Sequence, residues 1–359
     1  MALTTVNSGL LGTYAQYTGF KNRLINSAMM IDQRNAGASA SLTSSQTYFV
    51  DRWFGVEDTD GTMTIQRSTT APTGFINSLL MTTTSADASL GATQICYVGQ
   101  KIEGLNVYDL AWGTASASAV TLSFWVRSSL TGTFGGSLAN AAFVRSYPFT
   151  YTISVANTFE YKTITIAGDT TGTWPTDNGN SFQLIFGLGV GSTYSGTAGA
   201  WAGTGYLSAT SATSVIGTNG ATFYITGVQL EKGSTATSFD YRPYGTELQL
   251  CQRYYQKSYN TDVAPTTSTP VGCLGAPAYG AGSLGLSFQF CTTMRATPTI
   301  TVYSQTGSSG VVSQPGGTNV GSGFSVDQPS MRGSLAILSG SGMTTNSFYY
   351  CHYVANAEL

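Results

Sequence analysis

Apolar and polar residues alternate in short runs along much of this chain, and residues typical of tight turns separate the runs. The clearest runs are VTLSFWV at 120–126, FEYKTITI at 159–166, FQLIFG at 182–187 and TFYITGVQL at 222–230. Turn residues such as EDTDG at 57–61 and GDTTG at 168–172 stand between the runs. Because alternation with a period of two sends one side of each strand into a core, the pattern indicates half-buried strands. It predicts an all-β chain whose main part is a jelly-roll β-sandwich.

The scarcity of charge narrows the possible partners. Charged residues make up 9 % of the 359 residues, far below the roughly 25 % of an average soluble domain. No stretch approaches the roughly 18 consecutive apolar residues that a spanning helix needs, so we expect a soluble chain without membrane insertion. The net charge of −2 argues against nucleic acid as a partner, because phosphate binding needs clustered Lys and Arg.

Changes in pattern divide the chain into four regions. Residues 1–21 have no period and are predicted to be an N-terminal arm that orders only against a partner. Residues 22–245 are the predicted jelly-roll domain. A helix is predicted for ELQLCQRYYQK at 247–257, within a helical connector and linker at 246–270. Residues 271–359 are predicted to form a smaller C-terminal β-sandwich domain.

Residues suited to catalysis or to metal binding are few. The single histidine, His352, lies in the apolar run FYYCHYV, where it is more simply a structural strand residue than the partner of the adjacent Cys351. The five cysteines show no CxxC spacing, which predicts buried free thiols rather than disulfides or a zinc site. We therefore predict no enzymatic activity and no cofactor. Asp58 and Asp60 are spaced like the start of a calcium loop, although a tight turn is the simpler interpretation.

Aromatic residues in uncharged, hydroxyl-rich surroundings are the candidate ligand contacts. The segment 191–220 is rich in Gly, Ser, Thr and Ala and carries Tyr194, Trp201 and Tyr206. Trp174 lies in a similar context, between Thr and Pro. Exposed rings beside hydroxyl groups suit sugars, whose C–H faces stack on aromatics while their hydroxyls form hydrogen bonds. We predict these four residues as glycan contacts, while noting that such rings also fill subunit interfaces.

Two other tryptophans have a different context. Trp53 lies in DRWFGV and Trp125 in LSFWVR, both apolar strand-like runs. Bulky rings in such runs are typical of a buried core, so we predict both as core residues.

Two segments carry a resemblance to a known group of proteins. They are NRLINSAMMIDQRNAG with TYFVDRW, within 22–53, and FYITGVQLEKGSTATSFDYRPYGTELQLCQRYYQK, which begins at Phe223. Together with VTLSFWVRSS and EYKTITI, they resemble bacteriophage tail-fibre and appendage proteins, whose shared part is similar to a carbohydrate-binding-module jelly roll. The resemblance covers roughly residues 22–260. Because first and last strands of a sandwich lie together, we expect the two segments to be neighbours in space.

The resemblance implies a virion structural protein that is assembled in the host cytoplasm. It implies a homo-oligomer, most simply a homotrimer, that joins other virion proteins through the N-terminal arm and attaches to host-surface polysaccharide. A second interpretation is a capsid decoration, head-fibre or tail-connecting subunit that binds no glycan, and a third is a fibre that cleaves glycans. The resemblance carries no ligand residue, so the four aromatic contacts rest on exposure alone.

Overall fold

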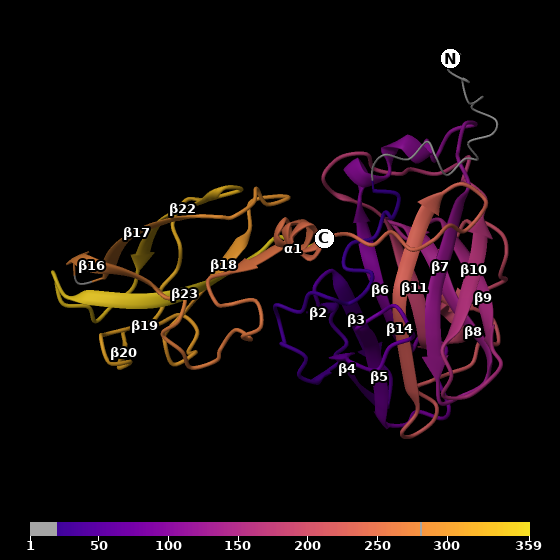
Figure 1. The fold of residues 1–359 in the computed structure, drawn as a ribbon, viewed down its shortest axis with the longest axis horizontal. Coiled ribbons are helices and arrows are strands. Elements are labelled where there is room, and N and C mark those ends of the chain that lie inside the picture. The colour runs from indigo at the N-terminus through magenta and orange to yellow at the C-terminus, as the bar shows by residue number, and fades with distance from the viewer. Residues whose placement is uncertain (1–19, 281) are drawn as a thin grey trace, which may run out of the picture.

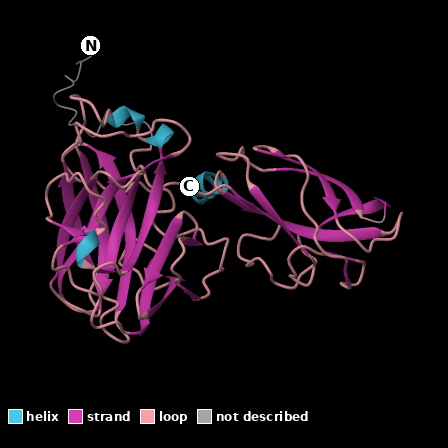
Figure 2. Ribbon diagram, turned by 180° about the vertical axis from the view of Figure 1, so that it is seen from behind, coloured by secondary structure: helices cyan, strands magenta, loops and turns pink. Residues whose placement is uncertain are grey.

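The computed structural model describes residues 20–280 and 282–359, and nearly all of its regular structure is β-strand (Figures 1 and 2). A large two-sheet region and a smaller elongated β region lie side by side, with one α-helix between them (Figure 1). The predicted fold class is confirmed: an all-β chain with a jelly-roll sandwich, a short helical connector and a smaller C-terminal β region. Most of the predicted arm, residues 1–19, lies outside the described residues. Among the helices that are described, none is long and apolar enough to cross a membrane.

Two six-stranded sheets form the larger region. The first has the order β1 (Ala40–Ser41), β4 (Thr62–Ser68), β5 (Ser78–Ser85), β14 (Thr222–Lys232), β7 (Val120–Ser128) and β10 (Glu160–Ile166). The second has the order β2 (Thr47–Val50), β3 (Trp53–Asp58), β6 (Ile95–Glu103), β11 (Asn180–Val190), β8 (Gly132–Asn140) and β9 (Ser146–Ile153). Consecutive strands such as β6, β7 and β8 change from one sheet to the other, which is the winding of a jelly roll.

Alternation along β7 shows how the sequence pattern builds the core. Leu122, Phe124 and Val126 are fully buried between the sheets. Trp53 is also fully buried, as predicted. The prediction for Trp125 is wrong, because it alternates with these core residues and therefore lies on the opposite face, where its ring is half-buried 5.4 Å from that of Tyr161.

The segment 191–220 is packed onto the second sheet rather than projecting from it. It holds a 3-10 turn η4 (Ser192–Tyr194) and a short parallel pair, β12 (Ser195–Gly196) and β13 (Ser208–Ala209). Leu207 is buried against the outer face of the sheet. A Cβ at Gly187 would lie 2.7 Å from the Ser208 hydroxyl oxygen, so the close approach requires glycine there. Two further 3-10 turns, η2 (Gly104–Asn106) and η3 (Tyr108–Leu110), follow β6.

The helix is shorter than the sequence predicts. It spans α1 (Tyr244–Gln252), beginning after Pro243, whose ring cannot donate a backbone hydrogen bond. The predicted last turn is instead strand β15 (Tyr255–Lys257), which pairs with residues 354–356. Strand pairing with a distant segment therefore overrides the local helical period.

The C-terminal β region is one hydrogen-bonded network of nine strands that pack around their own core. Its long strand β23 (Phe348–Asn356) pairs with β15 and with three others: β16 (Leu274–Gly280), β18 (Thr299–Tyr303) and β19 (Val312–Ser313). Strand β20 (Asn319–Val320) pairs with β19. The order then continues from β16 to β17 (Ser283–Gln289), β22 (Gly333–Ser339) and β21 (Pro329–Ser330).

The two segments that carry the resemblance lie against each other, as expected. The Arg23 amide donates to the Leu230 carbonyl at 2.9 Å, and Asn22 Nδ2 donates to the Val228 carbonyl at 2.9 Å. The indole of Trp53 donates to the Asn26 carbonyl at 3.1 Å. These contacts tie the start of the described chain to the last strand of the jelly roll.

Buried ion pairs join the two β regions. Glu358, next to the last residue, accepts hydrogen bonds from Arg52 and, at 2.9 Å, from Arg34. On the other side of the junction, Arg253 Nε donates to Glu103 at 3.1 Å. Both carboxylates are almost completely buried, so breaking either pair leaves a charge in a poor dielectric.

A candidate ligand groove between the two β regions

One face of β15, β23 and β18 is turned toward the jelly roll. Tyr255 and Thr299 both stand opposite Asn356 in the strand register, and Thr301 stands opposite Val354. Because side chains two residues apart share a face, Tyr303 lies on the same side as the two threonines. The sheet therefore presents a strip of aromatic, hydroxyl and amide side chains.

The opposite wall comes from the jelly roll. Tyr48 on β2 and the preceding Gln46 face the strip, and Arg34 lies between them. The Arg34 guanidinium stacks 3.8 Å from the centre of the Tyr255 ring and pairs with Glu358 at 2.9 Å. The floor of the groove is thus held in place by a cation–π contact and an ion pair.

The walls enclose an open groove of about 620 Å³, within the range of about 300–1,000 Å³ typical of small-ligand sites. Apart from Val354, its lining residues have polar side chains or tyrosine rings: Arg34, Gln46, Tyr48, Tyr255, Thr299, Thr301, Tyr303, Asn356 and Glu358. Within the described part of the chain, the hydroxyls of Thr299, Thr301 and Tyr303 make no hydrogen bond, and neither does the Asn356 amide nitrogen. These groups stay available to a ligand.

The tyrosine side chains of the groove are uncharged. Burial raises the pKa of both Tyr48 and Tyr255 well above the usual value for tyrosine. Burial also raises the pKa of Tyr303. All three phenols therefore stay protonated at neutral pH. The Tyr48 hydroxyl already donates to the Leu359 carbonyl at 3.0 Å, so towards a ligand it can only accept. On the floor, Glu358 pairs with Arg34 and also with Arg52.

The predicted tryptophan contacts are brought together, but in a packed cluster. The rings of Trp174 and Trp201 are 5.4 Å apart, and each contacts Trp112. Trp174 is buried and its indole donates to the Thr171 carbonyl at 3.0 Å. Trp201 is half-buried and its indole donates to the Ala167 carbonyl at 2.7 Å. The indole N–H groups of both tryptophans are thus already hydrogen-bonded within the protein.

The predicted tyrosine contacts lie elsewhere. Tyr194 packs against the buried cluster on the outer face of the second sheet, beside Leu207. The ring of Tyr206 covers Gly196, where a Cβ would lie 2.2 Å from it. The structure therefore places the two tryptophans in one cluster and the two tyrosines in another part of the loop region. Glycan binding by this loop stays a prediction.

Asp58 and Asp60 lie in a tight turn. Asp58 is exposed, and the Asp60 amide donates to the Asp87 carboxylate at 3.2 Å. Across residues 20–280 and 282–359, no three acidic, histidine or cysteine side chains are grouped as a metal would require. The turn interpretation therefore accounts for the two aspartates without an ion.

His352 is fully buried in β23, and both of its ring nitrogens are engaged. Nδ1 lies 2.9 Å from the Ser258 hydroxyl and Nε2 lies 2.9 Å from the Thr269 carbonyl. Since Nε2 must donate to the carbonyl, Nδ1 accepts from the hydroxyl in the neutral ring. Burial lowers the pKa of His352, which favours the same neutral form. Tyr259 stacks on the ring at 3.7 Å, so the histidine is a packed strand residue.

Sequence reasoning missed the groove. The alternation of Thr299, Thr301 and Tyr303 marked a half-polar strand, but nothing local indicated that its polar face would meet Tyr48. The sequence predicted buried free thiols. Cys96, Cys251 and Cys351 are buried, whereas Cys273 is half-buried and Cys291 is exposed.

No protein-family model and no curated protein matches this chain. Solved structures with a partial likeness include the enzymatically active domain of tailspike protein 4 from bacteriophage CBA120, at 15 % identity and a TM-score of 0.31, over 59 % of this chain and 21 % of that one. The family 11 carbohydrate-binding module from Clostridium thermocellum, in complex with a mixed-linked tetrasaccharide, matches at 11 % identity and a TM-score of 0.29, over 55 % of this chain and 98 % of the module. The N-terminal cellulose-binding domain of Cellulomonas fimi β-1,4-glucanase C matches at 15 % identity and a TM-score of 0.24, over 51 % of this chain and 90 % of that domain. This chain thus spans about a fifth of the length of the tailspike chain.

Proposed function

We propose that this protein is a non-enzymatic virion structural protein of a bacteriophage, a fibre or appendage subunit that attaches to host-surface glycans. The groove between the two β regions is the proposed glycan site. One observation carries the assignment of this site: tyrosine rings stand beside hydroxyl and amide groups that have no partner among the described residues.

The chemistry of a neutral sugar fits these walls. A pyranose ring has apolar faces that pack on aromatic rings, and Tyr48 and Tyr303 supply such rings from opposite walls. Its hydroxyls both donate and accept, as do those of Thr299 and Thr301.

Attachment to the particle is the second half of the proposal. The N-terminal arm, residues 1–21, joins the protein to other virion proteins, and a homotrimer places several grooves on one appendage. Repeated weak sites on one particle raise the overall avidity. In the alternative role of a capsid decoration or connecting subunit, the groove contacts a neighbouring virion protein instead of a glycan.

Tyr303→Ala tests the glycan site. The full-length protein is titrated with host-surface polysaccharide and with neutral oligosaccharides, and its oligomeric mass is measured. Losing a stacked aromatic hot spot costs about 2 kcal/mol or more, so we expect binding at least about tenfold weaker with an unchanged mass.

Tyr161→Ala is the matched control, since Tyr161 is an exposed strand tyrosine on the far sheet of the jelly roll. It should leave binding as in the wild type. Equal affinity of wild type and Tyr303→Ala for a polysaccharide that the wild type binds would remove the groove as the site. No glycan binding by the wild type, together with loss of the Tyr303→Ala variant from particles, would favour the decoration role.

A further inference from the structure

An open pocket of about 810 Å³, the Arg332 pocket, lies in the C-terminal β region between the end of β17, the loop at 290–293 and the turn that joins β21 to β22. It shares no lining residue with the groove. The Gln256 side chain on β15 donates to the Thr292 carbonyl of the loop at 2.8 Å. Because neighbouring side chains on a strand point to opposite faces, Gln256 lies on the other side of the sheet from Tyr255 of the groove. The Arg332 pocket therefore lies on the face away from the groove.

Hydrogen bonds hold the walls of the Arg332 pocket together. The Phe290 amide donates to the Arg332 carbonyl at 2.9 Å, which ties the loop to the turn. The Cys291 amide donates to the side-chain oxygen of Gln256 at 3.1 Å, and Gln256 is almost completely buried. The backbone that carries Arg332 is thus fixed before a ligand arrives, which lowers the entropic cost of binding.

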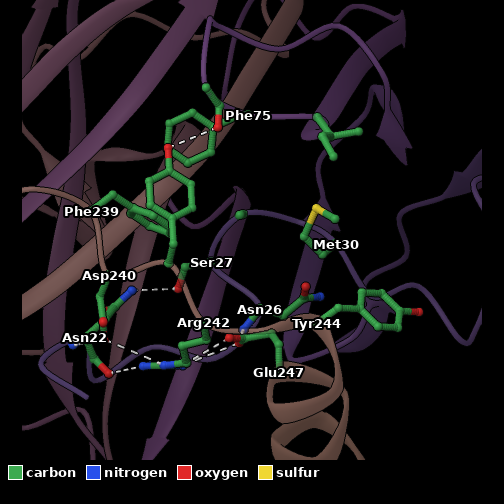
Figure 3. Close-up of a pocket in the computed structure, with 14 residues that line it drawn as sticks. Asn22, Asn26, Ser27, Met30, Phe75, Phe239, Asp240, Arg242, Tyr244 and Glu247 are labelled. Carbon is green, nitrogen blue, oxygen red and sulfur yellow. Dashed lines mark hydrogen bonds and ion pairs between the residues drawn. The ribbon is translucent and has the colours of Figure 1, made fainter. Parts of the chain in front are cut away.

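The Arg332 guanidinium has no partner within residues 20–280 and 282–359, where it takes part in no ion pair and no hydrogen bond. Other arginines are neutralised: Arg34 of the groove pairs with Glu358, and Arg242 pairs with Glu247 at 3.4 Å, as Figure 3 shows. In the described part of the chain, no acidic residue lines the Arg332 pocket. Because Arg332 is exposed, its charge is available to an anion from solvent.

Uncharged polar groups surround this cation. Four lining side chains have polar groups that make no hydrogen bond to another described residue: Ser287, Gln289, Thr292 and Thr293. The half-buried ring of Phe290 adds an apolar surface. A sugar offers C–H faces to such a ring and hydroxyls to such polar groups. The Arg332 pocket thus combines the elements of a sugar site with an unpaired positive charge.

We propose that the Arg332 pocket binds an acidic sugar, a hexuronate residue whose carboxylate pairs with the Arg332 guanidinium. The planar guanidinium matches a carboxylate and can donate two parallel hydrogen bonds to it. This inference rests on the proposed attachment to host-surface glycans. It adds a second site of different specificity, in which the groove takes neutral units and the Arg332 pocket takes acidic ones.

Calorimetric titration of the full-length protein tests the charge preference. The probes are trimers of galacturonate, glucuronate and mannuronate, and the same trimers with their carboxyl groups reduced to alcohols. The wild type should bind at least one acidic trimer about tenfold or more tightly than its reduced form, because hydrogen bonds to charged groups are the strong ones. Arg332→Gln should abolish this difference without changing the melting temperature.

Arg127→Gln is the matched control. It removes the same charge from an arginine on β7 that is half-buried and forms no ion pair within the described residues. It should bind the acidic trimer as the wild type does. Tyr303→Ala in the groove should also leave this binding unchanged, so a failure of the groove and a failure of the Arg332 pocket can be told apart.

The exposed thiol of Cys291, which lines the Arg332 pocket, gives an independent readout. Its alkylation by iodoacetamide, followed by peptide mass, should slow when the acidic trimer is bound and stay unchanged with the reduced trimer. The proposal is overturned if no acidic trimer binds more tightly than its reduced form, or if Arg332→Gln binds as the wild type does. Equally tight binding of glucose 6-phosphate would overturn the assignment of a carboxylate.

Discussion

The groove can be compared with a hollow beside the start of α1 (Figure 3), which is lined by Phe75, Phe239, Met30, Tyr244, Arg242 and Glu247. Both contain tyrosines, but most polar side chains of the hollow are bonded within the protein, with Arg242 Nε as an exception. In the groove, the hydroxyls of Thr299 and Tyr303 have no partner among the described residues. In the hollow, Arg242 and Glu247 bond to each other and to backbone groups. Aromatic rings by themselves do not identify a sugar site. Polar groups beside the rings that lack a hydrogen-bond partner do, because only such groups gain hydrogen bonds from a hydroxylated ligand.

Arg242→Ala should lower the stability of the protein most, because it removes the buried hydrogen bonds and the ion pair that Arg242 makes beside the hollow. The side chain is 4 % exposed, and its loss removes the guanidinium that pairs with Glu247 and donates to the Asn22 and Leu24 carbonyls. Breaking a buried pair costs about 3–5 kcal/mol, so the free energy of unfolding should fall by that amount in a denaturant titration. Arg23→Ala, which breaks a more exposed pair with Asp109, should cost less than about 1 kcal/mol. An equal loss of unfolding free energy in the two variants would mean that the bonds of Arg242 are worth no more than those of a surface ion pair.

Trp201→Ala distinguishes glycan binding by the loop at 191–220 from glycan binding by the groove. The Trp201 ring packs on Trp112, Trp174 and Tyr147, so its removal opens a cavity and should lower the free energy of unfolding by about 2–3 kcal/mol. Glycan binding should not change if the groove is the site. A tenfold loss of binding with an unchanged melting temperature would instead support the loop.

The pH dependence of stability tests Asp51, a buried residue that lies between the groove and the hollow. Asp51 accepts from Gln33 in front of the groove, and its carbonyl accepts from Asn26 beside the hollow. Burial raises the pKa of Asp51 from 3.8 to about 6. Because the folded state holds this proton more tightly than the unfolded state, the stability it provides is complete below about pH 4 and is lost as the pH rises to about 6.

Thermal melting of wild type and Asp51→Asn between pH 3.5 and about 7 measures this effect. The wild type should lose on the order of 2 kcal/mol relative to the variant across the window. Parallel curves would show that Asp51 titrates normally in the folded protein.

Thr299→Val should have the smallest effect on stability, because the side chain is exposed on a strand and valine favours strands. Losing one hydrogen bond of about 0.5–1.5 kcal/mol should weaken glycan binding by about two- to tenfold. Thr163→Val, an exposed threonine on β10 of the far sheet, is the control and should bind as the wild type does. If both variants bind alike, Thr299 does not contact the ligand.

Local patterns were sufficient for much of the fold. Period-two alternation identified β7, β10, β11 and β14, because each strand places one side in the core whichever strand lies beside it. The same pattern failed for Trp125, since an apolar run does not say which of its two faces is buried. The helical period failed at 255–257, where pairing with β23 replaced the expected end of the helix.

The sequence by itself determined the fold class, the neutral character of the surface and the proximity of the two segments that begin at residues 22 and 223. The first two depend on composition or on residues that are close together in one element, and the third follows from the expected neighbourhood of the first and last strands of a sandwich. Only the tertiary structure decided where a ligand could bind. The groove joins Arg34 and Tyr48 to Tyr255, Thr299 and Asn356, which are separated by hundreds of residues. Which polar groups stay unpaired depends on how the two β regions meet, and no local pattern records that long-range contact.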